Sequence, residues 1–103
     1  MASSKEYTAF IKDQLSLLEG MTYKAMMGEV LVYYRGKNVG GIYDDRFLVR
    51  PTASALRMMP HAAREKPYEG AKEMLLADNV DDREFLKELL CAMYADLPEP
   101  KKR

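Results

Sequence analysis

The chain has 103 residues, of which 48% are hydrophobic and 31% charged, a balance typical of one globular domain and not of a disordered or membrane protein. Equal numbers of basic and acidic residues give a formal net charge of zero, so no overall field attracts nucleic acid or anionic lipid. A single cysteine, a start without a signal-peptide segment and the absence of any apolar run of membrane-helix length predict a cytoplasmic protein outside the membrane.

The first predicted helix begins at Ser3, which can cap it while Glu6 completes a reciprocal capping box. Gly20 is a typical helix stop. Apolar residues recur between these limits at helical spacing and predict a stripe that packs against a core. They are Tyr7, Phe10, Ile11, Leu15 and Leu18.

From residue 22 to residue 50 the pattern changes to short runs rich in valine, isoleucine and tyrosine, separated by turn residues. This is typical of antiparallel strands, and we predict them near 22–27, 29–35, 38–43 and 46–50. The pairs Gly36-Lys37 and Asp44-Asp45 are the predicted turns, because glycine and aspartate tolerate the positive φ that two-residue hairpins require.

Two-residue loops would place one wholly apolar set of residues on a single sheet face. The predicted pairs are Tyr33 with Gly40, Leu31 with Ile42, Ile42 with Phe47, and Gly40 with Val49. In this register Gly40 leaves room under the Tyr33 ring, and Gly41 leaves the other face open beside Val32. That other, half-exposed face is predicted to carry Val30, Val32, Tyr34, Val39, Tyr43, Arg46, Leu48 and Arg50.

After Pro51, Thr52 can cap a short helix that continues to Met59 and ends at Pro60. Residues 61–72 have the composition of a surface loop, and residues 73–77 that of one further strand.

The last predicted helix has the strongest pattern in the chain. Asp81 can cap it, Glu84 can complete the capping box, and Val80 can pack against Phe85. Its buried stripe comprises Phe85, Leu86, Leu89, Leu90, Met93 and Leu97.

The order helix, four strands, helix, strand, helix predicts a single α+β domain over residues 1–103. We expect a two-layer sandwich in which an antiparallel sheet of about five strands carries the helices on one face. Residues 98–103, with their basic end, are expected to form a loose tail.

The segment MMGEVLVYYRGKNVGGIYDDRFLVRPT, with the helix segment KEYTAFIKDQLSLLEGMTYKAMMGE leading into it, resembles the TfoX (Sxy) N-terminal domain family over nearly the whole chain. Its most recognisable parts are Met26 to Glu29, the Tyr34-x-Gly36 hairpin and GIYDDRFLVR. The chain is similar to a standalone short member without the C-terminal domain of the full-length regulators. The resemblance implies a bacterial, cytoplasmic co-regulator of competence genes that acts with the cyclic-AMP receptor protein or RNA polymerase at promoters.

Several residues of types that can take part in catalysis or metal binding have structural interpretations in this sequence. His61 is predicted to be a solvated loop residue, and Cys91 a partly buried structural thiol. The acidic residues Asp78, Asp81 and Asp82 favour helix capping over a cation site. The run NVGG lacks the lysine and hydroxyl residue of a phosphate loop. We therefore expect no catalytic residue, cofactor or metal.

The candidate partner surface comprises Tyr34, Tyr43, Arg46 and Arg50, because aromatic residues and arginine are enriched where proteins contact one another. A solvated sheet face would carry the same residues, so both interpretations remain open. The first hypothesis is a non-enzymatic protein-interaction module. The alternatives are a homodimeric scaffold and a small-molecule binder with a cleft between residues 61–72 and the sheet. Without a basic helix or helix-turn-helix pattern, we do not expect direct nucleic-acid binding.

Overall fold

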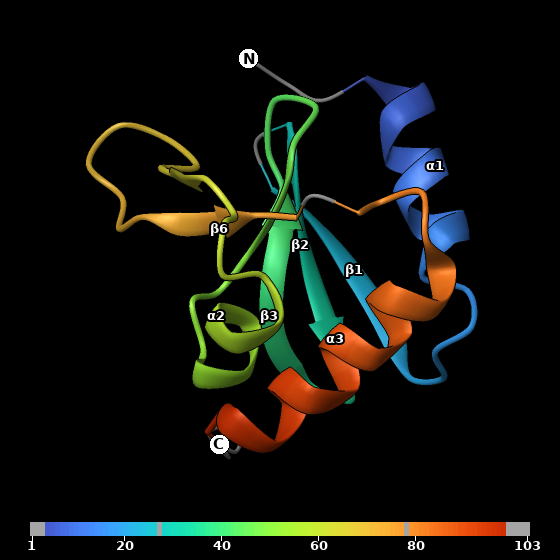
Figure 1. Cartoon of the computed structure of the whole chain (residues 1–103). Coiled ribbons are helices and arrows are strands. Elements are labelled where there is room, and N and C mark those ends of the chain that lie inside the picture. The colour runs from blue at the N-terminus through green and yellow to red at the C-terminus, as the bar shows by residue number, and fades with distance from the viewer. Residues whose placement is uncertain (1–3, 27, 78, 99–103) are drawn as a thin grey trace.

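The computed structural model describes residues 4–26, 28–77 and 79–98. The helices are α1 (Lys5–Gln14), α2 (Ala53–Met58) and α3 (Arg83–Asp96). The strands are β1 (Met21–Met26), β2 (Glu29–Tyr34), β3 (Lys37–Ile42), β4 (Phe47–Val49), β5 (Arg64–Glu65) and β6 (Met74–Leu76). They form one antiparallel sheet in the order β1-β2-β3-β4-β6-β5, and α3 lies in front of it in Figure 1.

The predicted fold class is confirmed, with one addition. The predicted element order holds except for β5, a two-residue strand within the segment expected to be entirely loop. This strand forms because Arg64 and Glu65 pair with Leu75 and Met74 of β6, a long-range contact that local sequence does not encode. Residues 99–103 of the predicted tail lie outside the described residues.

One face of the sheet packs against all three helices in a single hydrophobic cluster. A row of paired residues across four strands marks this face: Val32, Gly40, Val49 and Leu75. The neighbouring row, on the opposite face, is Leu31, Gly41, Leu48 and Leu76. The helix layer contributes Ile11 and Leu15 from the α1 region, Ala55 from α2, and the α3 stripe Leu86, Leu89, Leu90 and Met93.

The hairpin between β3 and β4 was predicted correctly. Asp44 and Asp45 both have positive φ, 52° and 57°, and Tyr43 and Arg46 exchange backbone hydrogen bonds around them. The predicted pairs Ile42 with Phe47 and Gly40 with Val49 are present.

The predicted register between β2 and β3 is wrong. The turn lies at Arg35 and Gly36, whose φ values are 50° and 87°, so Lys37 is the first residue of β3 and pairs with Tyr34. A bulge beyond Tyr33 then shifts the ladder, and the Asn38 amide supports it by donating to the carbonyl oxygens of Val32 and Gly40. Side chains alternate between faces along a strand, so a one-residue shift exchanges the two faces.

The shift reverses the predicted placement of β2 and of Val39. Val30, Val32, Tyr34 and Val39, predicted on the open face, pack into the helix-covered core. Leu31 and Tyr33, predicted to be covered, lie in the alternate positions of β2 and are half-buried. The glycines still have packing roles, but with other neighbours: a Cβ on Gly40 would lie 2.1 Å from the Leu48 carbonyl oxygen.

Two helix caps lie one residue after their predicted positions. Ser4 accepts a hydrogen bond from the Tyr7 amide and caps α1, while Ser3 lies outside the described residues. Asp82, rather than Asp81, accepts from the Phe85 amide and caps α3. The predicted Thr52 cap of α2 is confirmed, since its hydroxyl accepts from the Ala55 amide.

A buried lysine joins the sheet to the end of α3. Lys37 is 6% exposed, and its ammonium group donates to the carbonyl oxygens of Tyr94 and Leu97, each at 3.0 Å. The same group lies 4.0 Å from the centre of the Tyr94 ring. The cation thus lies at the C-terminal end of α3, where the helix dipole favours positive charge, and adds a charged donor to the Tyr94 carbonyl oxygen, which also accepts from the Leu97 amide.

We predict that Lys37→Met lowers the free energy of unfolding by about 2 kcal/mol, because the apolar stem is kept while two buried carbonyl oxygens lose a charged donor. Urea denaturation followed by circular dichroism measures the change. Lys87→Met, at an exposed position on α3, is the matched control and should change stability by less than about 0.5 kcal/mol. Equal losses for the two variants would contradict the anchoring role of Lys37.

Candidate binding groove

The four residues of the predicted partner surface do not form one surface. Tyr34 is 6% exposed and lies under α3, where its ring meets Tyr94 edge-on at 5.5 Å and its hydroxyl is 3.7 Å from the Cys91 sulfur. Its predicted placement on the open face is wrong, because the turn at residues 35–36 directs it to the helix side. A partner-binding role for Tyr43, Arg46 and Arg50 stays a prediction.

Tyr43 lies over Gly41, on the side of the sheet away from the helices. A Cβ on Gly41 would be 2.6 Å from the Tyr43 ring, so only glycine leaves space for the ring at this position. The Tyr68 ring lies 6.4 Å away at a tilted angle. Burial raises the pKa of the Tyr43 phenol, so its hydroxyl is a neutral hydrogen-bonding group at neutral pH.

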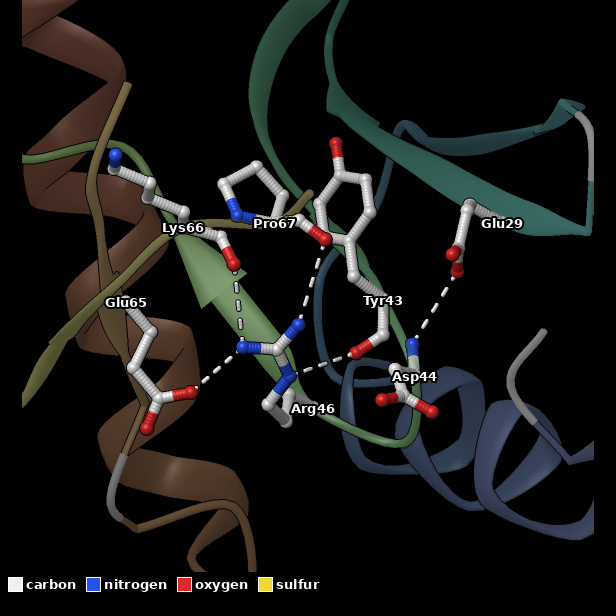
Figure 2. Close-up of polar contacts among 7 residues, drawn as sticks. All are labelled: Glu29, Tyr43, Asp44, Arg46, Glu65, Lys66 and Pro67. Atoms are coloured by element: carbon white, nitrogen blue, oxygen red, sulfur yellow. Dashed lines mark hydrogen bonds and ion pairs between the residues drawn. The ribbon is translucent and has the colours of Figure 1, made fainter. Parts of the chain in front are cut away.

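Arg46 fastens the segment after β5 to the β3–β4 turn, as Figure 2 shows. Its guanidinium pairs with the Glu65 carboxylate at 2.7 Å and donates to the carbonyl oxygens of Lys66 and Pro67 at 3.3 and 3.4 Å. Its Nε donates to the Tyr43 carbonyl oxygen at 3.2 Å. Arg46 therefore acts as a structural clamp more than as a free contact residue.

The clamped segment forms one wall of an open groove of about 470 Å³. Tyr43 and Asn38 lie at its sheet side, Arg50 at the exit of β4, and Tyr68 and Lys72 on the segment after β5. Tyr68 is 63% exposed, an unusual exposure for a large aromatic side chain. The remaining lining residues are Pro51, Thr52, Pro67, Ala71, Glu73, Met74, Asp96, Leu97 and Pro98.

The groove combines aromatic surface with charges of both signs. Arg50 and Lys72 are exposed cations, and Glu73 and Asp96 are exposed acids on its lining. The Asp96 carboxylate accepts a hydrogen bond from the Ser54 amide at 2.7 Å, and the hydrogen bonds from Ser54 lower its pKa. Asp96 thus helps to join α3 to α2. The groove suits an amphipathic segment that offers apolar surface, hydrogen-bonding groups and charged groups of either sign.

The groove lies where the sequence analysis placed a possible cleft, between residues 61–72 and the sheet, but Tyr68, Lys72 and Asn38 were not named as members of the site. They come from the segment predicted to be a surface loop and from the start of β3, and only the long-range pairing of β5 with β6 brings them together. One local signal was available: the tyrosine between Pro67 and Gly70 is the one aromatic residue besides His61 in a segment otherwise composed of polar, turn and alanine residues.

Of the other residues considered from sequence, His61 and Cys91 do not line the groove, whereas Asn38, the first residue of the run NVGG, does. His61 is exposed in a loop, as predicted. Cys91 is exposed, so its predicted partial burial is wrong; it lies beside the buried stripe of α3 and not within it. The run NVGG belongs to β3, and Asp78 lies outside the described residues.

Residues 4–26, 28–77 and 79–98 contain no group of three or more histidine, cysteine, aspartate or glutamate side chains placed to hold a metal ion. No helix in the same part of the chain is both long and apolar enough to cross a membrane.

Replacement of Arg46 by alanine is predicted to release the groove wall, because four contacts to Tyr43, Glu65, Lys66 and Pro67 are lost together. Trypsin should then cleave after Lys72 at least about tenfold faster, since local opening controls proteolysis of a folded segment. Mass spectrometry of limited digests would measure this rate. Arg50→Ala is the control, and the same acceleration in that variant would count against the clamp.

Comparison with known proteins finds a relative that spans the whole chain. It is described as "Uncharacterized 12.7 kDa protein in trpE 5'region" of Spirochaeta aurantia, is 34% identical over 104 residues, and is covered over 90% of its own length. No family model matches the chain, and no solved structure matches it. The identity and the coverage show common ancestry, and the chain belongs to the same family as this Spirochaeta aurantia protein.

Proposed function

We propose that this protein is a non-enzymatic interaction module that binds a protein partner through the groove lined by Tyr43, Arg50, Tyr68 and Lys72. The observation that carries the proposal is the exposed Tyr68 ring held beside Tyr43, with two exposed cations on the same lining. Tyrosine and arginine are the residues most often responsible for binding energy at protein interfaces.

The proposal includes membership of the TfoX N-terminal domain family and a cytoplasmic role as a bacterial transcriptional co-regulator. The sequence features in support are the Tyr34-x-Gly36 hairpin and the segment GIYDDRFLVR, which supplies Tyr43 and Arg46. Under this proposal the partner is the cyclic-AMP receptor protein or RNA polymerase, and the protein acts by surface complementarity without chemistry of its own.

Binding of the purified chain to each of these two proteins tests the proposal. We expect Tyr68→Ala and Arg50→Ala each to weaken binding by about tenfold, as for central interface residues, while both variants keep the circular dichroism spectrum. Biolayer interferometry at moderate salt provides the affinities. Lys87→Ala, exposed on the helix layer, should bind as the wild type does.

If both groove variants bound as tightly as the wild type, the groove would not be the contact surface. Failure of the wild-type chain to bind either protein would reject this choice of partners.

A small-molecule ligand is a second candidate, favoured by the size of the groove. Its volume of about 470 Å³ falls within the range of roughly 300 to 1,000 Å³ that is usual for ligand sites. The alternative predicts that a compound in a metabolite library raises the melting temperature of the wild type and not of Tyr68→Ala, since a ligand stabilises only a state that binds it. Differential scanning fluorimetry is the measurement, and equal stabilisation of both proteins would place the compound outside the groove.

A further inference from the structure

The strand β1 forms one edge of the sheet and pairs on one side only, with β2. The Arg35 amide donates to the Gly20 carbonyl oxygen at 2.9 Å, which fixes the phase of this antiparallel ladder. Along an antiparallel strand, the backbone N–H and C=O groups of every second residue point toward the neighbouring strand. Gly20 points toward β2, so Thr22, Lys24 and Met26 do so as well. The backbone N–H and C=O groups of Met21, Tyr23 and Ala25 therefore point outward.

The two edges of the sheet differ in how much backbone they leave open. The β5 edge has two residues, whereas β1 has six and contains no proline. The outer part of β1 is open to solvent: Thr22, Lys24, Ala25 and Met26 are exposed, Met26 by 46%. A long, regular and exposed edge strand is a template for pairing with another strand, and proteins that avoid such pairing shorten or interrupt the edge. Here only β5 is shortened.

We propose that two copies of this chain form a dimer by antiparallel pairing of β1 with β1, about a twofold axis at Tyr23. Tyr23 of one copy then lies opposite Tyr23 of the other, and Met21 lies opposite Ala25 in both directions. All three outward-facing residues of each copy are used, which gives about six main-chain hydrogen bonds. The two sheets become one continuous sheet.

Charge and main-chain pairing together favour this register over the two neighbouring ones. With the axis at Tyr23, each Lys24 lies opposite Thr22 of the other copy, in the closely spaced pairs where side chains approach most. Moving the axis to Lys24 would place two lysines opposite each other, and moving it to Thr22 would leave Ala25 without an opposite outward-facing residue in β1. The strand is therefore complementary to itself in one register.

The helix layer leaves space beside this edge. A groove of about 390 Å³ lies between α1 and the far end of β1 and β2, lined by Lys5, Thr8, Ala9, Lys12, Ala25, Gly28, Glu29 and Val30. The Lys12 ammonium lies 5.0 Å from the centre of the half-buried Tyr23 ring, a cation–π contact that joins α1 to β1. The pairing does not involve the groove lined by Tyr43, and it does not depend on the proposed function.

Sedimentation equilibrium over a range of concentrations tests the dimer. The wild-type chain should be dimeric, and Ala25→Pro should raise the dissociation constant by about tenfold or more, because it removes an outward N–H from each copy while leaving the bonds to β2. The matched control is Ala53→Pro at the first residue of α2, a position that accepts proline; it should dimerise as the wild type does.

Opposite charges at Thr22 test the register and do not depend on proline being tolerated. Thr22→Glu should dimerise more tightly than the wild type and Thr22→Lys less tightly, with dissociation constants about tenfold apart at low salt and converging at high salt. Melting temperatures measured at a concentration where the chain is monomeric separate this effect from monomer stability. A wild-type chain that stays monomeric, an unaltered dimer in folded Ala25→Pro, or equal dissociation constants for the two Thr22 variants would overturn the proposal.

Discussion

The buried ammonium group of Lys37 is the contact on which the arrangement of the two layers depends. It lies between the first residue of β3 and the last turn of α3, and it meets two carbonyl oxygens and the face of Tyr94. A charge this far from water is retained only where several groups compensate it. The preceding turn lies at Arg35 and Gly36, and it pairs Lys37 with Tyr34, whose ring packs against Tyr94 of the same helix. The turn and the bulge beyond Tyr33 together set which residues of β2 face the helices, and the Lys37 contact holds α3 over them.

The groove depends on a second set of long-range contacts, around Arg46. The guanidinium joins the β3–β4 turn to the segment after β5 through Glu65 and two backbone carbonyls. The Tyr43 ring packs directly over Gly41, whose missing Cβ leaves space for it. The aromatic side of the groove is therefore formed before any ligand arrives, and preorganisation of this kind lowers the entropy lost on binding.

These contacts explain which features the sequence could predict. The helices, the fold class and the Asp44–Asp45 turn follow from local patterns, because capping residues, apolar spacing and tolerance of positive φ act over a few residues. The turn at Arg35 and Gly36 was missed because arginine rarely adopts positive φ. The contact that accompanies this turn joins Lys37 to α3, some 60 residues further along the chain, and the residues around the turn carry no signal of it.

The same difference between local patterns and long-range contacts explains why only part of the candidate site could be predicted. Tyr43 and Arg50 could be proposed because they lie on or beside β3 and β4, which local patterns identify. Tyr68 and Lys72 reach the groove through the pairing of β5 with β6 and through the Arg46 clamp, neither of which has a signature in the neighbouring residues. The composition of a loop does not indicate the sheet edge on which that loop lies.

The sheet order separates the two surfaces for which functions are proposed. β2 lies between the edge strand β1 and the strand β3 that supplies Asn38 to the groove, and the other groove wall follows β5 at the opposite edge. Pairing through β1 would therefore leave the groove lined by Tyr43 open in each copy of a dimer. Two sites held on one continuous sheet bind a partner with repeated sites more tightly than either site does alone, because the second contact becomes intramolecular. A homodimer and a partner-binding module, alternatives when considered from sequence, are thus compatible in this fold.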